Sequence, residues 1–112
     1  MATKHFLIIV TAMLMLPQLA RAEICTVDDG FWLQPRSGLT VLNNAAIKPC
    51  VSALLADNQS KLFINYNDTD ESSISATELR QWLIALALPA ARIILKKQAA
   101  STNTISLETQ HD

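Results

Sequence analysis

The chain has 112 residues, of which half are hydrophobic, and nine basic residues stand against ten acidic ones. A chain of this length forms one small domain. Its charge balance excludes the basic stripe with which nucleic-acid-binding proteins neutralise phosphates, and it argues against electrostatic docking on anionic lipid.

The first 22 residues have the pattern of a secretory signal peptide. Lys4 gives a positive start, and an apolar run extends from Phe6 to Leu16 before Pro17 breaks it. Ala20-Arg21-Ala22 places small residues at the two positions that determine cleavage, so we expect a cut after Ala22. The apolar run is too short for a spanning helix, which needs about 20 apolar residues. We therefore predict an exported protein, periplasmic or secreted, with no membrane span after cleavage.

Cys25 and Cys50 are the only cysteines, and both lie in the exported part. Without its leader the chain has 90 residues, seven basic and ten acidic, a formal charge of −3. An even cysteine count in an oxidising compartment indicates a disulfide. The alternative is a redox or metal pair, but the spacing is far from C-x-x-C and no histidine lies nearby. We predict a structural bridge that contributes roughly 3 kcal/mol.

Residues 23–38 form a predicted N-terminal arm. They show no sustained hydrophobic period, and they contain both glycines. Cys25 would tie this arm to the domain. Phe31, Trp32 and Leu33 are expected to pack from the arm onto the domain, because no pattern supports a ligand-stacking role for the indole ring.

The domain itself is predicted over residues 39–109, with a frayed tail at 110–112. Its first strand is expected at Leu39–Asn43, and Pro49 is well placed to open the helix that follows. The next strand is predicted at Lys61–Tyr66, where the sequence is a compact apolar and aromatic run.

The strongest structural signal lies between Lys61 and Lys97, which reads as strand, acidic loop, helix, turn and strand. Ser75 and Glu78 have the S-x-x-E spacing of a capping box, and Ile74 before them would form a hydrophobic staple. We therefore expect the helix to run from Ala76 to about Leu86. Its apolar residues recur at helical spacing, so one stripe can pack on a sheet.

Residues 92–97 and 104–109 are predicted as the last two strands, the second because Ile105 and Leu107 alternate with polar residues. The polar connection between them favours an antiparallel pair. The predicted fold class is α+β: a two-layer β-α-β-α-β-β arrangement with two helices packed on one face of a mixed sheet.

Three local motifs are Asn43 to Pro49 (NNAAIKP), Asn65 to Asp68 (NYND) and Trp82 to Ile93 (WLIALALPAARI). Their order resembles the OmpA-like peptidoglycan-binding domain, in which they would be a strand exit, the end of the second strand, and a helix end with its turn and third strand. The resemblance spans residues 39–109 and implies that fold, with peptidoglycan as the ligand. The pattern LxIxY…ELRxWLxALxxPxxRI is also similar to that of small uncharacterised exported bacterial proteins.

In the OmpA-like family an aspartate and a helical arginine hold the carboxylate and amine of diaminopimelate. The resemblance places Asp68 at the aspartate position, but the matching helical positions, Ile74 and Ser75, carry no arginine. Arg80 lies more than a turn further along. Ala87 stands where the family has a glycine with positive φ, a conformation that costs alanine roughly 1 kcal/mol. Without the family arginine, recognition of a carboxylate lacks its bidentate partner.

The predicted domain contains no histidine that could act as a catalytic base. The only histidines are His5 in the leader and His111 in the tail, so neither a serine triad nor a cysteine–histidine pair can be assembled. Zinc has no ligand cluster. We predict no catalytic residue, no metal and no cofactor, and we expect that the protein is not an enzyme.

Asp68, Asp70 and Glu71 form an acidic loop. It does not match an EF-hand, because the sixth position counted from Asp68 is not glycine and the twelfth is Leu79. The simpler interpretation is a solvated loop whose acids favour the positive end of the following helix. The functional alternative is ligand contact through Asp68, Asp70 and Arg80, although Arg80 is most simply a solvated side chain.

Taken together, the sequence favours a non-enzymatic, exported envelope protein that acts as a small binding module, with peptidoglycan as the first ligand to test. The alternative is a structural or adaptor subunit of an envelope protein complex. Such a subunit would bind its partner through a sheet edge or through Phe31–Leu33. Neither function involves nucleic acid.

Overall fold

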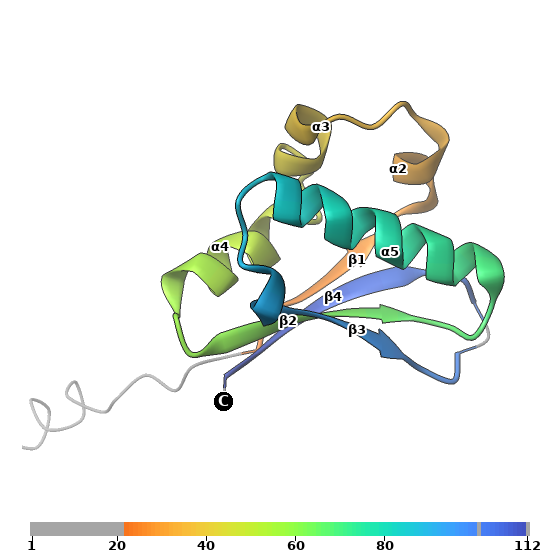
Figure 1. Cartoon of the computed structure of the whole chain (residues 1–112). Helices are drawn as coiled ribbons and strands as arrows, with labels where there is room; N and C mark the ends of the chain where they lie inside the picture. Colours follow the sequence, from red (N-terminus) through yellow and green to blue (C-terminus); the bar gives the residue numbers. More distant parts are fainter. Residues whose placement is uncertain (1–21, 101, 112) are drawn as a thin grey trace, which may run out of the picture.

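The computed structural model describes residues 22–100 and 102–111 (Figure 1). The predicted leader up to Arg21, and also Ser101 and Asp112, lie outside the described residues. The strands are β1 (Ile24–Val27), β2 (Ser60–Tyr66), β3 (Ile93–Lys97) and β4 (Ile105–His111). The helices are α2 (Asp29–Leu33), α3 (Gly38–Leu42), α4 (Lys48–Ala56), α5 (Asp70–Ala85) and the short 3-10 helix η1 (Ala90–Arg92). Within the described ranges, no helix combines the length and apolarity needed to cross a bilayer.

The four strands form one mixed sheet in the order β1-β4-β2-β3. β2 and β3 are parallel, whereas β4 runs antiparallel to both β1 and β2. The predicted antiparallel pair of the last two strands is wrong, because β2 lies between β3 and β4 in the sheet. The helices lie together on one face of this sheet (Figure 1). Leu62, Ile64, Ile105 and Leu107 alternate with polar or half-buried neighbours and are fully buried, as expected for side chains that face the helices. The predicted α+β class is confirmed, with two short helices, α2 and α3, beyond the two that were expected.

The strand–helix–strand unit predicted between Lys61 and Lys97 is confirmed as β2, α5 and β3. The helix buries Ala76, Leu79 and Leu83 in the core, so its apolar stripe packs toward the sheet as its spacing predicts. Ile74 is 70% exposed. The predicted hydrophobic staple is therefore wrong.

α5 begins at Asp70, well before the predicted start. Oγ1 of Thr69 accepts a 3.2 Å hydrogen bond from the backbone N–H of Ser72, which makes Thr69 the N-cap. The predicted capping box of Ser75 and Glu78 is wrong, because both residues lie inside the helix. The S-x-x-E spacing is ambiguous here because a threonine six residues upstream supplies an equally good cap.

The predicted strand at Leu39–Asn43 is also wrong, since this segment is the helix α3. Oγ of Ser37 accepts from the N–H of Thr40, and Oγ1 of Thr40 accepts from the N–H of Ser37. This reciprocal cap starts a helix despite the strand propensity of the residues that follow. The first strand is β1, which lies in the segment predicted as an arm. Four residues are too few for a recognisable alternation.

The predicted disulfide between Cys25 and Cys50 is confirmed, and it ties β1 to α4. Both cysteines are buried in the core, and so is Phe31, the central residue of α2. Trp32 packs against the core while half-buried. Leu33 is 85% exposed, so the expectation that it packs on the domain is wrong.

The prediction of a frayed tail is wrong for Gln110 and His111, which belong to the last strand. β4 continues to His111, which lies opposite Ser60, and Gln110 lies opposite Lys61. Gln110 and His111 are polar, so the hydrophobic pattern gives no sign that the strand continues through them. Ladder pairing with β2 and a contact of His111 with Asp57 hold this end in place.

The turn after α5 is a Schellman motif centred on Ala87, whose φ is 75°. The N–H of Ala87 donates to the carbonyl of Ile84 at 3.0 Å, and the N–H of Leu88 donates to the carbonyl of Leu83 at 3.1 Å. Pro89 then prevents further helix. The positive φ expected at Ala87 from the family resemblance is therefore observed.

Ala87→Gly is expected to raise the free energy of unfolding by roughly 0.5–1 kcal/mol. Glycine adopts the left-handed conformation without the steric strain that alanine has there. The greater conformational entropy of glycine in the unfolded chain offsets only part of this gain. Urea denaturation measures the change. Ala85→Gly, at the exposed end of α5, is the matched control and should lower the same free energy. A loss of stability in Ala87→Gly would contradict the assignment of this turn.

Candidate functional site

Asp68 and Asp70, two of the residues predicted for ligand binding, lie together at the start of α5. Asp68 is exposed in the loop after β2, and its Oδ1 lies 3.1 Å from Nζ of Lys97, the last residue of β3. This contact raises the pKa of Lys97, chiefly through the hydrogen bond to the carboxylate. Asp70 is exposed in the first turn of the helix, where its charge is favourable.

Arg80 lies at the opposite end of β3 from these two carboxylates. Its Nε donates to the carbonyl of Ile93 at 2.9 Å, and its Nη2 donates to the carbonyl of Ala90 at 3.0 Å. β3 has five residues and spans roughly 13 Å, so Arg80 does not share a site with Asp68. The expectation of a solvated Arg80 is wrong, because the guanidinium is half-buried and holds the backbone at the start of β3.

A cleft of about 370 Å³ opens next to the acidic loop. It lies between α2, the first turns of α5 and the loop that joins β3 to β4. Its lining combines apolar, acidic and neutral polar side chains: Asp29, Trp32, Leu33, Glu71, Ser75 and residues 102–104.

The indole ring of Trp32 is a fixed wall of this cleft. The Phe31 ring packs edge-on against it, with centroids 4.8 Å apart and planes at 83°. The guanidinium of Arg36 lies over the ring, 5.4 Å from its centroid, and Nη1 of Arg36 donates to the carbonyl of Trp32 at 2.9 Å. Arg36 also donates to both carboxylate oxygens of Glu78, which holds the pKa of Glu78 below its usual value. Contacts within the chain therefore hold this wall in place.

The other side of the cleft is held by Asn67, which is almost fully buried. Its Nδ2 donates to the carbonyl of Thr102 at 2.7 Å and to Oδ1 of Asn103 at 2.8 Å. Its Oδ1 accepts from Oγ1 of Thr69 at 2.8 Å. Nδ2 of Asn103 donates in turn to Oε2 of Glu71 at 3.1 Å. This network joins the β3–β4 loop to the start of α5 and fixes one oxygen of Glu71.

The cleft is electrostatically negative. Among the residues that the structure describes, Asp29 and Glu71 are the charged ones that line it, and no described lysine, arginine or histidine does. Within residues 22–100 and 102–111, no group of three His, Cys, Asp or Glu side chains is arranged to hold a metal ion. The acids, the half-buried indole of Trp32 and the exposed side chain of Leu33 suit an organic ligand that carries a positive charge.

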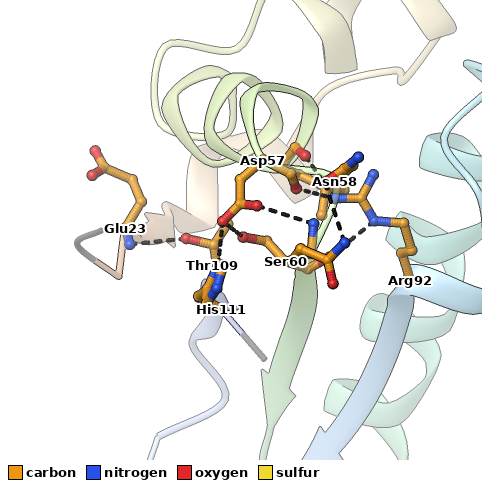
Figure 2. Close-up of polar contacts among 9 residues, drawn as sticks. Glu23, Asp57, Asn58, Ser60, Arg92, Thr109 and His111 are labelled. Carbon is orange, nitrogen blue, oxygen red and sulfur yellow. Dashed lines mark hydrogen bonds and ion pairs between the residues drawn. The ribbon is translucent and has the colours of Figure 1, made fainter. Parts of the chain in front are cut away.

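A second polar cluster lies at the other end of the sheet, around Asp57 (Figure 2). Oδ2 of Asp57 accepts from Oγ of Ser60 at 2.7 Å and lies 2.6 Å from Nδ1 of His111. Serine and histidine thus share one carboxylate oxygen, whereas a catalytic relay needs the histidine between the serine and the acid. Arg92 donates to the carbonyls of Leu54, Asp57 and Ser60 in the same cluster. The arrangement joins α4, β2 and β4 structurally.

The Asp57 cluster gives the fold a dependence on acid pH. Hydrogen bonds from His111, then Ser60, then the N–H of Gln59 lower the pKa of Asp57 from 3.8 to about 2. A carboxyl whose pKa is lower in the folded state stabilises the fold above the unfolded pKa. This stability is lost as the pH falls from about 4 to about 2.

We expect the urea midpoint of the wild type to fall through this pH window, and the midpoint of Asp57→Asn to fall less. Denaturation at pH values on either side of the window measures both slopes. Equal slopes for the two proteins would contradict a special role of Asp57.

Comparison with known protein families, with characterised proteins and with solved structures finds no match for this chain. The class of the protein therefore follows from its own fold and cleft: a small disulfide-linked α+β domain with an acidic, aromatic-walled cleft.

Sequence reasoning missed most of the residues that build the cleft and the cluster at the other end of the sheet. Asn67 carried one signal, since it follows a strand directly and begins the turn sequence NDT. Arg36, Arg92 and Asn103 carried none, because each binds residues distant in the chain.

Proposed function

We propose that this protein is a non-enzymatic, exported module of the cell envelope that binds its ligand in the cleft walled by Trp32. The single observation that carries the proposal is the cleft itself, in which a rigid indole faces a network that fixes the carboxylate of Glu71. Preorganised sites of this kind lose less entropy on binding than mobile ones.

Export is supported by two independent features. The leader sequence has the charge, apolar run and small residues of a signal peptide. The Cys25–Cys50 disulfide is buried and structural, as is typical of proteins that fold in an oxidising compartment.

Peptidoglycan is the first ligand to propose. Its sugars can stack on an exposed aromatic ring, and the amino groups of its peptides can pair with carboxylates. Asp29 and Glu71 line the cleft, and Asp68 lies in the same loop region. Arg80 is engaged with the backbone of β3, so the proposal depends on the acids and the indole and not on the arginine of the OmpA-like family.

A pull-down on purified sacculi tests this function with the folded, oxidised protein. We expect retention of the wild type and a loss of about fivefold or more in Glu71→Gln and in Asp68→Ala, because each variant removes one negative charge. Glutamine at position 71 can still accept the hydrogen bond from Asn103. Retention should also weaken as salt is raised.

Glu108→Gln is the matched control, because this acid lies on β4 between Phe63 and Ile24 and away from the cleft. It should bind as the wild type does. Absent retention of the wild type, or equal retention of all four proteins, would remove the peptidoglycan proposal.

A further inference from the structure

The cleft walled by Trp32 is lined by three kinds of side chain. The apolar kind includes the indole ring itself, and the second kind is the pair of carboxylates of Asp29 and Glu71. The third kind is neutral and polar, with Ser75 on α5 and residues 102–104 in the loop before β4. Hydroxyl and amide groups both donate and accept hydrogen bonds. The lining therefore suits a ligand that carries hydroxyl groups as well as a positive charge.

The indole ring of Trp32 offers such a ligand a fixed apolar surface. The ring is half-buried, and the guanidinium of Arg36 lies over it, 5.4 Å from its centroid. Both carboxylate oxygens of Glu78 accept hydrogen bonds from Arg36, so the charge of the guanidinium is compensated and does not cancel the negative charge of the cleft. The C–H groups of a sugar ring can pack on an aromatic ring, because its face carries a partial negative charge.

One acid of the cleft stands next to this indole on α2. Asp29 and Trp32 are three residues apart in the helix, so they are neighbours on its surface, with roughly 5–6 Å between their Cβ atoms. The carboxylate of Asp29 is exposed. A positive group that pairs with it must lie close to whatever packs on the indole. An ammonium group bonded directly to a sugar ring meets this condition.

The other acid, Glu71, has a similar neighbour on α5. Ser75 lies four residues further along and therefore on the same side of the helix. Nδ2 of Asn103 donates to Oε2 of Glu71 at 3.1 Å, which fixes the direction of the carboxylate. Glu71 is exposed, so Oε1 can accept from an ammonium group while the hydroxyl of Ser75 bonds a hydroxyl of the same ligand. Each helical wall thus combines a carboxylate with a group that suits a sugar ring.

We propose that the cleft binds a glycan whose sugar rings carry free amino groups, in their ammonium form. This inference rests on the proposed function and narrows its ligand to amino sugars that are not acetylated, in place of the amino groups of the peptides. Acetylation would remove the positive charge and leave Asp29 and Glu71 without a charged partner. A basic peptide also carries ammonium groups, but the alkyl chain of a lysine brings no hydroxyl to the neutral polar lining. The glycan is therefore the favoured occupant.

Two oligosaccharides test the proposal on the folded, oxidised chain: a tetramer of glucosamine, and the same tetramer with every amino group acetylated. Each is titrated at mildly acidic pH, where free amino groups are protonated, while NMR follows the indole N–H resonances. The chain has two tryptophans, and Trp82 is not among the described residues that line the cleft, so its resonance is an internal control. We expect the glucosamine tetramer to shift Trp32 alone and to bind about tenfold more tightly than the acetylated one.

Three variants assign this preference to the acids. Asp29→Asn and Glu71→Gln each remove one negative charge, and each should lower the preference for the glucosamine tetramer about threefold. Asp28→Asn is the matched control. It makes the same change one residue earlier, at an exposed acid that is not among the described residues of the cleft lining, and it should keep the preference. Added salt should weaken binding of the glucosamine tetramer more than that of the acetylated one.

Equal binding of the two tetramers, an unchanged Trp32 resonance, or an undiminished preference in Asp29→Asn and Glu71→Gln would each overturn the inference. A blocked lysine tetrapeptide that shifts Trp32 and binds as tightly as the glucosamine tetramer would assign the cleft to basic peptides and would overturn it too. The sacculus pull-down separates this inference from the proposed function. Retention that depends on Glu71 without a preference between the tetramers would keep the function and overturn the inference. A preference without retention would support the inference and remove peptidoglycan as the ligand.

Discussion

Replacing Cys25 and Cys50 by serine is expected to lower the free energy of unfolding by about 3 kcal/mol. The bridge joins two cysteines separated by 25 positions and closes a loop that includes most of β1 and all of α2 and α3. Without it the unfolded chain regains the entropy of that loop. A domain with roughly 90 residues has a total stability of only about 5–10 kcal/mol. The loss is therefore a large share of the whole.

Urea denaturation with and without reductant measures this effect. Reduction should lower the free energy of unfolding of the wild type, and it should leave that of the double serine variant unchanged. β1 should open first, because its covalent link to α4 is removed while α5 keeps its packing on β2 and β3. Faster amide exchange in β1 than in β2 of the double variant would show this order. A variant as stable as the wild type would contradict the account.

The sequence predicted the β2–α5–β3 unit because each of its signals is local. A compact apolar strand, an apolar stripe at helical spacing and a proline after the helix all concern residues close together in the chain. The positive φ at Ala87 follows from the same turn. The disulfide could be predicted as well, since two cysteines allow only one intramolecular pair.

The first strand and the candidate site could not be predicted in this way. Whether Leu39 to Leu42 or Ile24 to Val27 pairs with β4 depends on a distant disulfide and on a cap at Ser37, and strand propensity points to the wrong one. The cleft wall depends on Arg36 bridging to Glu78, 42 residues away. Such contacts follow from the tertiary arrangement, and no local pattern encodes them.

Arg92→Ala is the other change with a large expected effect: it should lower the free energy of unfolding by about 2–3 kcal/mol. Nε of Arg92 donates to the carbonyl of Ser60 at 2.9 Å. Its Nη2 donates to the carbonyls of Leu54 at 2.7 Å and Asp57 at 2.5 Å. The last carbonyls of a helix have no partner within the helix, so a cation at this end of α4 satisfies them and favours the helix dipole. Figure 2 shows the guanidinium at this junction with β2.

Arg92→Lys should lose less than the alanine variant, because an ammonium group keeps the charge but cannot hold three carbonyls in the planar fork of a guanidinium. Lys48→Ala is the control: it removes an exposed cation from the other end of α4 and should change stability by less than about 0.5 kcal/mol. Thermal and urea unfolding of the three variants give the ranking. An alanine variant as stable as the control would mean that water replaces the guanidinium at these carbonyls. A loss in the expected range would show that Arg92, which no local sequence pattern identifies, holds the end of α4 to the start of β2.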